Sequence, residues 1–213
     1  PDVVVFVDEA SMAYIRSNPA GLGQSLIGKS RDLLLRSGAS VGFYLQSDVQ
    51  NDNLPDAPLY LFLNAVRVTN AERQAIRERL HTPGKTVAWL YAAGVFDEHG
   101  LTDQEIGDTV GMVLRVQPWN TRLGSKLTDA KSPVTARLRS GKRALGQDEI
   151  FNPSYTVIDP QATILAEYAS NGAPSLAVRE HSSGWRSVFI GDPHLTNDLL
   201  RGLYAYAGVP AYE

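Results

Sequence analysis

The chain has 213 residues, of which 43% are apolar and 20% charged, with a net charge of −3 and no cysteine. This length can bury a full hydrophobic core, and the slightly acidic balance argues against nucleic-acid binding, which needs a basic surface. No apolar run reaches the ~20 residues that span a bilayer, so we expect no membrane-spanning helix. The absence of cysteine excludes disulfides, thiolate metal sites and a cysteine nucleophile.

The sequence predicts one domain over residues 1–213. Because it opens on Pro1 and a strand, without an initiator methionine, we expect it to be cut from a longer chain. No segment identifies a compartment, and the localisation stays open.

The first elements in chain order are a strand, a helix and a second strand. Residues 3–7 form an apolar run that predicts a buried strand. Residues 10–23 are interrupted by proline and glycine and are expected to be irregular, before a helix over 24–36 that stops at Gly38. A strand over 41–45 follows, and then a loop over 51–58.

Residues 58–94 are the clearest strand–helix–strand unit. Their runs at 59–63 and 86–91 are apolar without alternation, as in parallel strands covered on both faces. Between them Thr69 and Glu72 fit a capping box at the start of a helix. We expect an inward stripe of Ala71, Ala75, Ile76 and Leu80, and a solvated face of Glu72, Arg73, Arg77, Glu78 and Arg79. Such a crossover is right-handed and makes the protein α/β.

The rest of the chain predicts a mixture of elements. A second capping box over 102–105 starts a helix that ends near Gly111, and a strand over 112–116 follows. Residues 117–153 are irregular and predict an excursion with one hairpin. Strands are expected at 155–158, 163–168, 176–179 and 185–190, with turns at Gly172 and Gly184, and a last helix at 196–207 with Gly208 as its C-cap.

Three local motifs have a functional and a structural interpretation. Residues 23–30 match the phosphate-binding pattern GxxxxGK[ST], but no strand runs into the first glycine, which favours a chance match. Asp97, Glu98 and His99 could bind a metal, although their place before Gly100 favours an exposed turn. The basic cluster of Arg137, Arg139, Lys142 and Arg143 could contact an acidic partner or simply be solvated. We predict no metal and no cofactor.

Polar residues follow several predicted strands, where open α/β sheets place their ligands. They define a candidate rim of Asp8, Glu9, Gln46, Ser47, Asn64 and Tyr91. This rim could hold a sugar or another small ligand, or its side chains could anchor loops. A freestanding hydrolase that uses Asp8 or Glu9 as its base is a further alternative, although no nucleophile partners either residue.

Four stretches together resemble a known family: VFVDExSM at 5–12, LYLFLNA at 59–65, RxxIR at 73–77 and WLYAAG at 89–94. They resemble the glutamine-amidotransferase-like domain that follows the catalytic barrel in β-galactosidase-type glycoside hydrolases, where it is called the trimerisation domain. The closing stretch at 184–201 is also similar to that family, and the resemblance covers residues 3–116 and 155–209. It implies a flavodoxin-like or class I amidotransferase-like three-layer sandwich, with a mainly parallel sheet and antiparallel C-terminal strands.

The resemblance also implies that catalysis is absent from this chain. Amidotransferases carry the nucleophile motif GxCxG, and aligning its last glycine with Gly94 puts Ala92 at the nucleophile, where a methyl group cannot attack an amide. The family's His-Pro-Glu has no counterpart in step, since His194 comes late. The expected function is a non-catalytic accessory domain of a larger glycoside hydrolase, which contributes subunit contacts or borders the sugar site. Its implied partners are the catalytic barrel of the same polypeptide and further copies of the chain.

Overall fold

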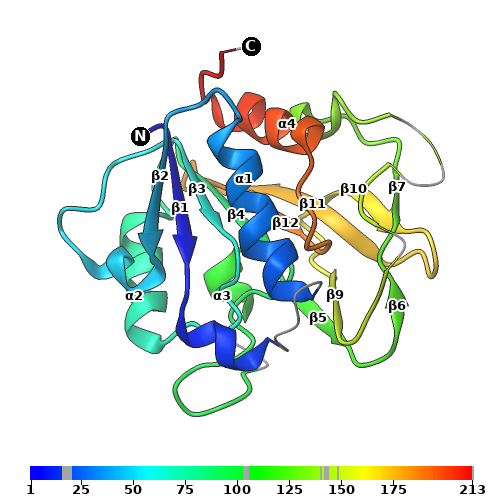
Figure 1. Cartoon of the computed structure of the whole chain (residues 1–213), viewed down its shortest axis with the longest axis horizontal. Helices are drawn as coiled ribbons and strands as arrows, with labels where there is room; N and C mark the ends of the chain where they lie inside the picture. The colour runs from blue at the N-terminus through cyan, green and yellow to red at the C-terminus, as the bar shows by residue number, and fades with distance from the viewer. Residues whose placement is uncertain (16–20, 103–105, 140, 142–143, 148, 213) are drawn as a thin grey trace.

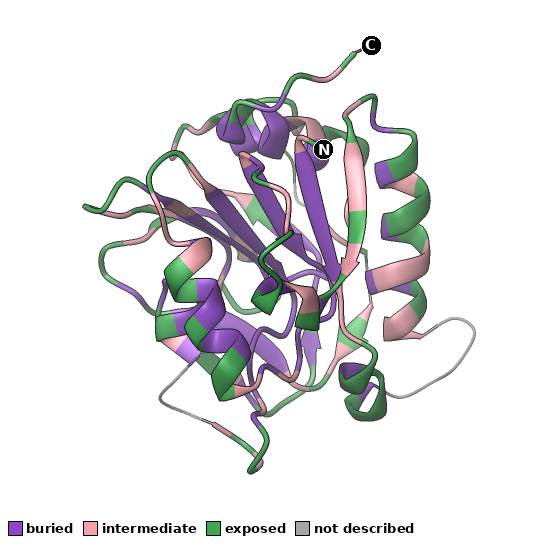
Figure 2. Cartoon of the chain, turned by 90° about the vertical axis from the view of Figure 1, so that its left-hand side faces the viewer, coloured by how far each residue is buried: buried purple, intermediate pink, exposed green. Residues whose placement is uncertain are grey.

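The computed structural model describes residues 1–15, 21–102, 106–139, 141, 144–147 and 149–212. The chain forms a three-layer α/β sandwich, in which α1 and α2 lie on opposite faces of a central sheet (Figure 1, Figure 2). This confirms the fold class that the sequence predicts.

The central sheet has eight strands in the order β2-β1-β3-β4-β12-β11-β10-β7. Five neighbouring strands are parallel: β2 (Val41–Leu45), β1 (Val3–Val7), β3 (Leu59–Phe62), β4 (Thr86–Leu90) and β12 (Arg186–Ile190). The three strands beyond β12 pair antiparallel: β11 (Pro174–Glu180), β10 (Thr163–Tyr168) and β7 (Ser125–Leu127). The expected antiparallel C-terminal extension is therefore present.

The apolar runs explain the parallel half of the sheet. All residues of β3 and β4 are buried, as are the first four of β1. On one face Phe62 stacks between Phe6 and Trp89, with ring centroids 4.6 and 4.0 Å away. Strand β2 differs, because it is an edge and its side chains are only partly covered.

The segment 117–153 contributes to the central sheet as well as standing outside it. Its strand β7 pairs with β10, whereas β6 (Thr121–Arg122) and β8 (Ile150–Phe151) form a small separate sheet. The expected strands at 112–116 and 155–158 appear as β5 (Leu114–Gln117) and β9 (Ser154–Val157), which pair with each other outside the central sheet.

The helices begin and end close to the predicted residues. They are α1 (Ser30–Leu35), α2 (Asn70–Arg79), α3 (Ile106–Val110) and α4 (Asn197–Ala207), with short 3₁₀ turns at Ala10–Tyr14, Gln46–Gln50 and Pro133–Thr135. A π-helical segment, Gln24–Lys29, continues directly into α1. Thr69 and Glu72 form the predicted capping box, and Gly208 ends α4 in the left-handed conformation. The second capping box, at 102–105, falls largely outside the described residues.

The predicted faces of α2 were wrong at three positions. Ala71 is exposed, whereas Glu72 and Arg73 are buried, with Arg73 only 1% exposed. Glu72 accepts hydrogen bonds from the Thr69 N–H and from the Gln46 side chain. Arg73 reaches through the structure to the loops after β3 and β4. Helical periodicity predicts that these charged residues face solvent, because it contains no information on hydrogen-bond partners that lie far away in the sequence.

Candidate functional site

Two of the predicted rim residues hold each other in place. The Asn64 side chain accepts a hydrogen bond from the Asp8 N–H (2.8 Å) and donates one to the Asp8 carbonyl (2.7 Å). The Asp8 carboxylate in turn accepts from the Ser11 N–H at 2.7 Å. Asn64 is fully buried. The Asn64 amide thus joins the ends of β1 and β3, and the Asp8 carboxylate stabilises the turn after β1, so both side chains anchor loops.

The other rim residues lie in different environments. Gln46 is buried and donates to the Arg67 carbonyl and to Glu72, while Glu9 and Ser47 are exposed. Tyr91 lines a cavity. The use of the predicted rim as a binding site stays a prediction.

Tyr91 occupies a sharp turn directly after β4. Its φ is +63°, in the left-handed region that bulky residues rarely adopt, so the surrounding structure must stabilise this turn. Arg73 does so by donating to the Gly94 carbonyl (2.8 Å) and to the Val68 carbonyl (3.1 Å). The alignment of Ala92 with the nucleophile position of the motif stays a prediction.

A cavity of about 610 Å³ opens beside this turn, and we call it the β4 pocket. Buried residues that include Tyr91, Ala92 and Tyr155 line it, together with more exposed ones that include Tyr14 and Ile150. The volume is within the usual range for small-molecule sites. A larger hollow, of about 830 Å³, is lined by residues between 127 and 138 together with Gly141, and it has Asp129 and Lys131 in its wall.

The β4 pocket is electrically neutral. Its described lining contains no acidic or basic side chain. Burial raises the pKa of Tyr91 and of Tyr155, so both phenols keep their protons at neutral pH. The Tyr91 hydroxyl donates a hydrogen bond to the Pro153 carbonyl. The Tyr91 and Tyr155 rings pack edge to face, with their centroids 5.1 Å apart. The described lining of the pocket therefore consists of neutral side chains at neutral pH.

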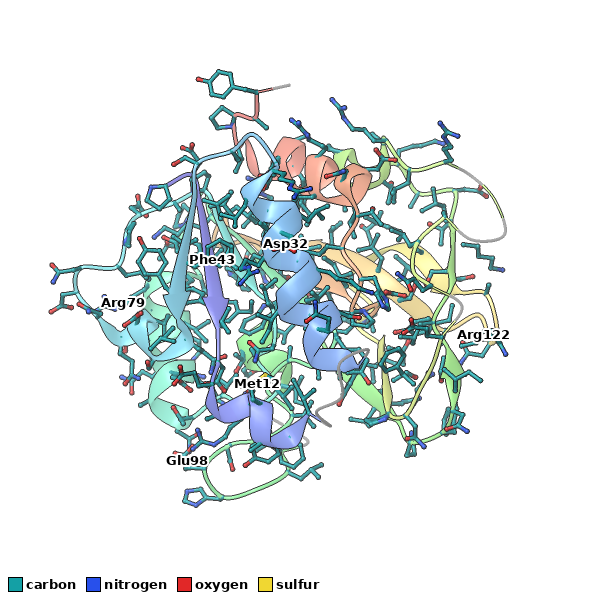
Figure 3. All side chains as sticks on the ribbon, viewed as in Figure 1. Met12, Asp32, Phe43, Arg79, Glu98 and Arg122 are labelled. Carbon is teal, nitrogen blue, oxygen red and sulfur yellow. The ribbon has the colours of Figure 1, made fainter. Side chains whose placement is uncertain are left out.

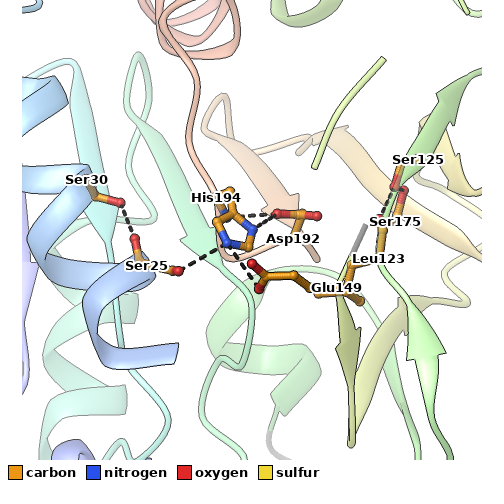
Figure 4. Close-up of polar contacts among 8 residues, drawn as sticks. All are labelled: Ser25, Ser30, Leu123, Ser125, Glu149, Ser175, Asp192 and His194. Atoms are coloured by element: carbon orange, nitrogen blue, oxygen red, sulfur yellow. Dashed lines mark hydrogen bonds and ion pairs between the residues drawn. The ribbon is translucent and has the colours of Figure 1, made fainter. Parts of the chain in front are cut away.

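A second polar cluster, which we call the Ser25 relay, lies between α1 and the loop after β12 (Figure 4). The Ser25 hydroxyl is 3.1 Å from Nε2 of His194, and Nδ1 of His194 is 2.8 Å from Asp192. The Glu149 carboxylate lies 3.6 Å from the same Nε2. A neutral imidazole that donates to Asp192 can accept the Ser25 proton, so the connectivity is that of a serine–histidine–aspartate triad.

The Ser25 relay is closed to substrate. Ser25, Asp192 and His194 are each at most 5% exposed. Gly146 covers the aspartate so closely that a Cβ there would fall 1.9 Å from Oδ2 of Asp192. Burial raises the pKa of Asp192, opposed by its hydrogen bond to His194. In this structure the Ser25 hydroxyl is therefore enclosed, and its hydrogen bond joins the helical segment before α1 to the loop after β12.

Local sequence patterns predict the strand before Asp192 and His194 but not their partner, because Ser25 and His194 are 169 positions apart. Only the structure brings His194 to Ser25 on the helical segment before α1.

The structure places the other motifs as follows, with Asp97 buried where the sequence favours an exposed turn. Residues 24–29 are helical, so the phosphate-binding match forms no loop. Asp97 accepts from the N–H groups of His99 and Gly100, which lower its pKa, and Glu98 (Figure 3) accepts from the Asn70 N–H. Of the basic cluster, Lys142 and Arg143 fall outside the described residues. No group of three or more metal-binding side chains occurs in the described part of the chain, and none of its helices is long and apolar enough to cross a membrane.

Comparison with known proteins gives the fold a context. No protein-family model and no curated protein sequence matches the chain. Solved structures do match. A β-galactosidase from Rahnella sp. R3 is 15% identical, with a TM-score of 0.71 over 99% of this chain and 32% of its own. A β-galactosidase from Bacillus circulans is 16% identical, with a TM-score of 0.68 over 99% of this chain and 31% of its own.

A smaller protein shares the fold over most of its length. A ThuA-like protein from Bacteroides uniformis is 12% identical, with a TM-score of 0.62 over 96% of this chain and 90% of its own. By contrast, this chain spans only about a third of the length of the β-galactosidases from Rahnella sp. R3 and Bacillus circulans. The resemblance inferred from the sequence is confirmed at the level of the fold.

Proposed function

We propose that the chain is a non-catalytic accessory domain of a larger glycoside hydrolase of the β-galactosidase type. The observation that carries this proposal is coverage: nearly the whole chain corresponds to about a third of the β-galactosidases from Rahnella sp. R3 and Bacillus circulans. The neutral pocket and the closed relay support it, since neither can perform hydrolysis. The catalytic carboxylates would then lie on a barrel in the same polypeptide.

The proposed role of the domain is to make subunit contacts or to border the sugar site of the parent enzyme. Strand β2 is suited to the first role (Figure 2). It pairs only with β1 among the described strands and has no charge or proline, the usual protections of a free edge. Phe43 (Figure 3) and Leu45 are 36% and 45% exposed.

A second copy of the chain fits this edge by symmetry. Val41, Phe43 and Leu45 share one face of β2, because side chains alternate along a strand. An antiparallel pair of β2 strands centred on Phe43 would place each Val41 opposite the Leu45 of the other copy. We expect Phe43→Lys to lower the oligomeric state in sedimentation and Val113→Lys, at another exposed apolar residue, to leave it unchanged. If Phe43→Lys leaves the oligomeric state unchanged, β2 is not the subunit contact.

The intact mass of the natural gene product in its source cell tests the accessory-domain proposal. A mass far above the 23.2 kDa of this chain is expected. A mass close to 23.2 kDa would contradict the proposal, because no barrel would then accompany the domain.

A second candidate function is the binding of a small neutral ligand at the carboxyl end of β4. The β4 pocket beside Tyr91 is the observation that favours it, because pockets of this size with apolar and aromatic walls are typical ligand sites. Of the rim residues predicted from the sequence, this smaller candidate site keeps Tyr91, in the turn after β4. A rise in the melting temperature with neutral sugars would support it, and no rise with any of them would argue against it.

A further inference from the structure

The β4 pocket contains a hydroxyl without a partner. Tyr155 is 4% exposed and lines the pocket, and its hydroxyl forms no hydrogen bond with any described residue. Its neighbour Tyr91 has already donated to Pro153. This phenol in the pocket wall therefore has a proton to donate and no partner among the described residues, and a ligand oxygen could accept its hydrogen bond.

Several aromatic rings line the β4 pocket together with Tyr155. The Tyr155 ring meets Tyr91 at 88°, and Phe151 meets Tyr91 at 61°. Nearer the mouth, Tyr14 stacks on Phe96 with ring centroids 4.5 Å apart. Such surfaces favour a ligand with an apolar ring face.

Charge excludes most other ligands. An ion that enters this pocket loses its hydration and finds no opposite charge among the described lining residues. Phosphates, carboxylates and amines therefore fit poorly. Asn152 is exposed at the mouth and supplies a neutral amide that can both donate and accept.

We propose that the β4 pocket binds a single neutral sugar ring. An apolar face of the ring packs on the aromatic wall, and a ring or hydroxyl oxygen of the sugar accepts a hydrogen bond from the Tyr155 hydroxyl. A pyranose combines these two properties, since its C–H groups form apolar faces and its oxygens lie around the edge. The inference deepens the second candidate function and rests on it. It does not require that the parent polypeptide be a hydrolase.

The experiment is a saturation-transfer NMR titration of the 213-residue chain with the methyl β-glycosides of glucose and galactose, and with phenol as a flat aromatic probe. We expect saturable binding of at least one glycoside. Tyr155→Phe keeps the ring and removes the hydroxyl, and it should weaken binding about 3- to 10-fold, the value of one neutral hydrogen bond.

Tyr206→Phe is the matched control. Its hydroxyl likewise has no hydrogen-bond partner among the described residues, but it is buried outside the pocket, so this change should leave binding as it was. Ala92→Leu places a larger side chain on the pocket wall and should abolish binding. Circular dichroism establishes that each variant is folded, and if Ala92→Leu does not fold, the pair of tyrosine variants decides alone.

Three results would overturn the inference: no saturable binding of either glycoside, binding of phenol alone, or equal effects of Tyr155→Phe and Tyr206→Phe. The intact-mass measurement is independent of all three. A failed titration therefore leaves the accessory-domain proposal in place, and a natural mass of 23.2 kDa leaves the pocket in place.

Discussion

The β4 pocket and the Ser25 relay divide the requirements of an active site between them. The pocket is open and has the volume for a ligand, but its described lining has no nucleophile and no base. The relay has a nucleophile, a base and an orienting carboxylate in sequence, but its serine is 3% exposed. An enzyme needs both features at one point. Their separation supports a role in binding and assembly over a role in chemistry.

Removal of Arg73 should have the largest effect, because this side chain holds the turn that forms the pocket wall. Arg73→Ala leaves the buried carbonyls of Val68 and Gly94 without their donor, and we expect a loss of about 3 kcal/mol or more in the free energy of unfolding. Urea denaturation measures it.

Arg77→Ala on the exposed face of the same helix is the control, with an expected change within about 0.5 kcal/mol. Equal effects of the two substitutions would show that Arg73 does not stabilise the turn.

Removal of Asp192 should destabilise the fold by less. Asp192→Ala deprives both Nδ1 and the backbone N–H of His194 of their acceptor, with an expected cost of about 2 kcal/mol. Glu149→Ala should cost under about 1 kcal/mol, because Glu149 is 42% exposed and its contact is long. If the two variants unfold at the same urea concentration, the relay is not a structural tie.

The pH dependence of stability should be set outside both regions. His81 and His181 stack on the two faces of Trp185, at 3.7 and 3.8 Å. Burial lowers the pKa of each to about 4 from 6.5, aided by the charge of His181 on His81 and of Arg179 on His181. Their contribution is therefore complete above pH 6.5 and is lost as the pH falls toward 4. Asp192 acts in the opposite direction, because its raised pKa favours the folded state as the pH falls.

Melting temperatures at pH 7 and pH 4.5 measure the net effect. We expect a lower value at pH 4.5, and a smaller difference when His81 and His181 are both replaced by phenylalanine, which retains the stacking. His99→Phe, at an exposed position, should leave the difference as in the wild type. A wild-type melting temperature that is equal at the two pH values would contradict this account.

The sequence predicted the framework of the fold better than its polar interior. Apolar runs and the Thr69–Glu72 capping box located β1, β3, β4 and α2, because these signals are local. The same local rules placed Arg73 in solvent and gave no sign that Ser25 meets His194. Hydrogen bonds between distant segments decide both positions, and one sequence does not contain that information.

The candidate site was predicted only in part. Placement of polar strand ends on a rim led to Tyr91, which lines the pocket, but also to Asn64 and Gln46, which are buried and bonded internally. The partnerless hydroxyl of Tyr155 and the left-handed turn at Tyr91 depend on tertiary packing. No local sequence pattern predicts either feature.

Reaction of the chain with a serine-directed fluorophosphonate, followed by intact mass spectrometry, tests the central claim most directly. The account predicts no adduct on the folded chain, because the Ser25 hydroxyl is enclosed. An adduct that forms on the folded chain and disappears in Ser25→Ala would contradict it, since the relay would then be an accessible catalytic centre.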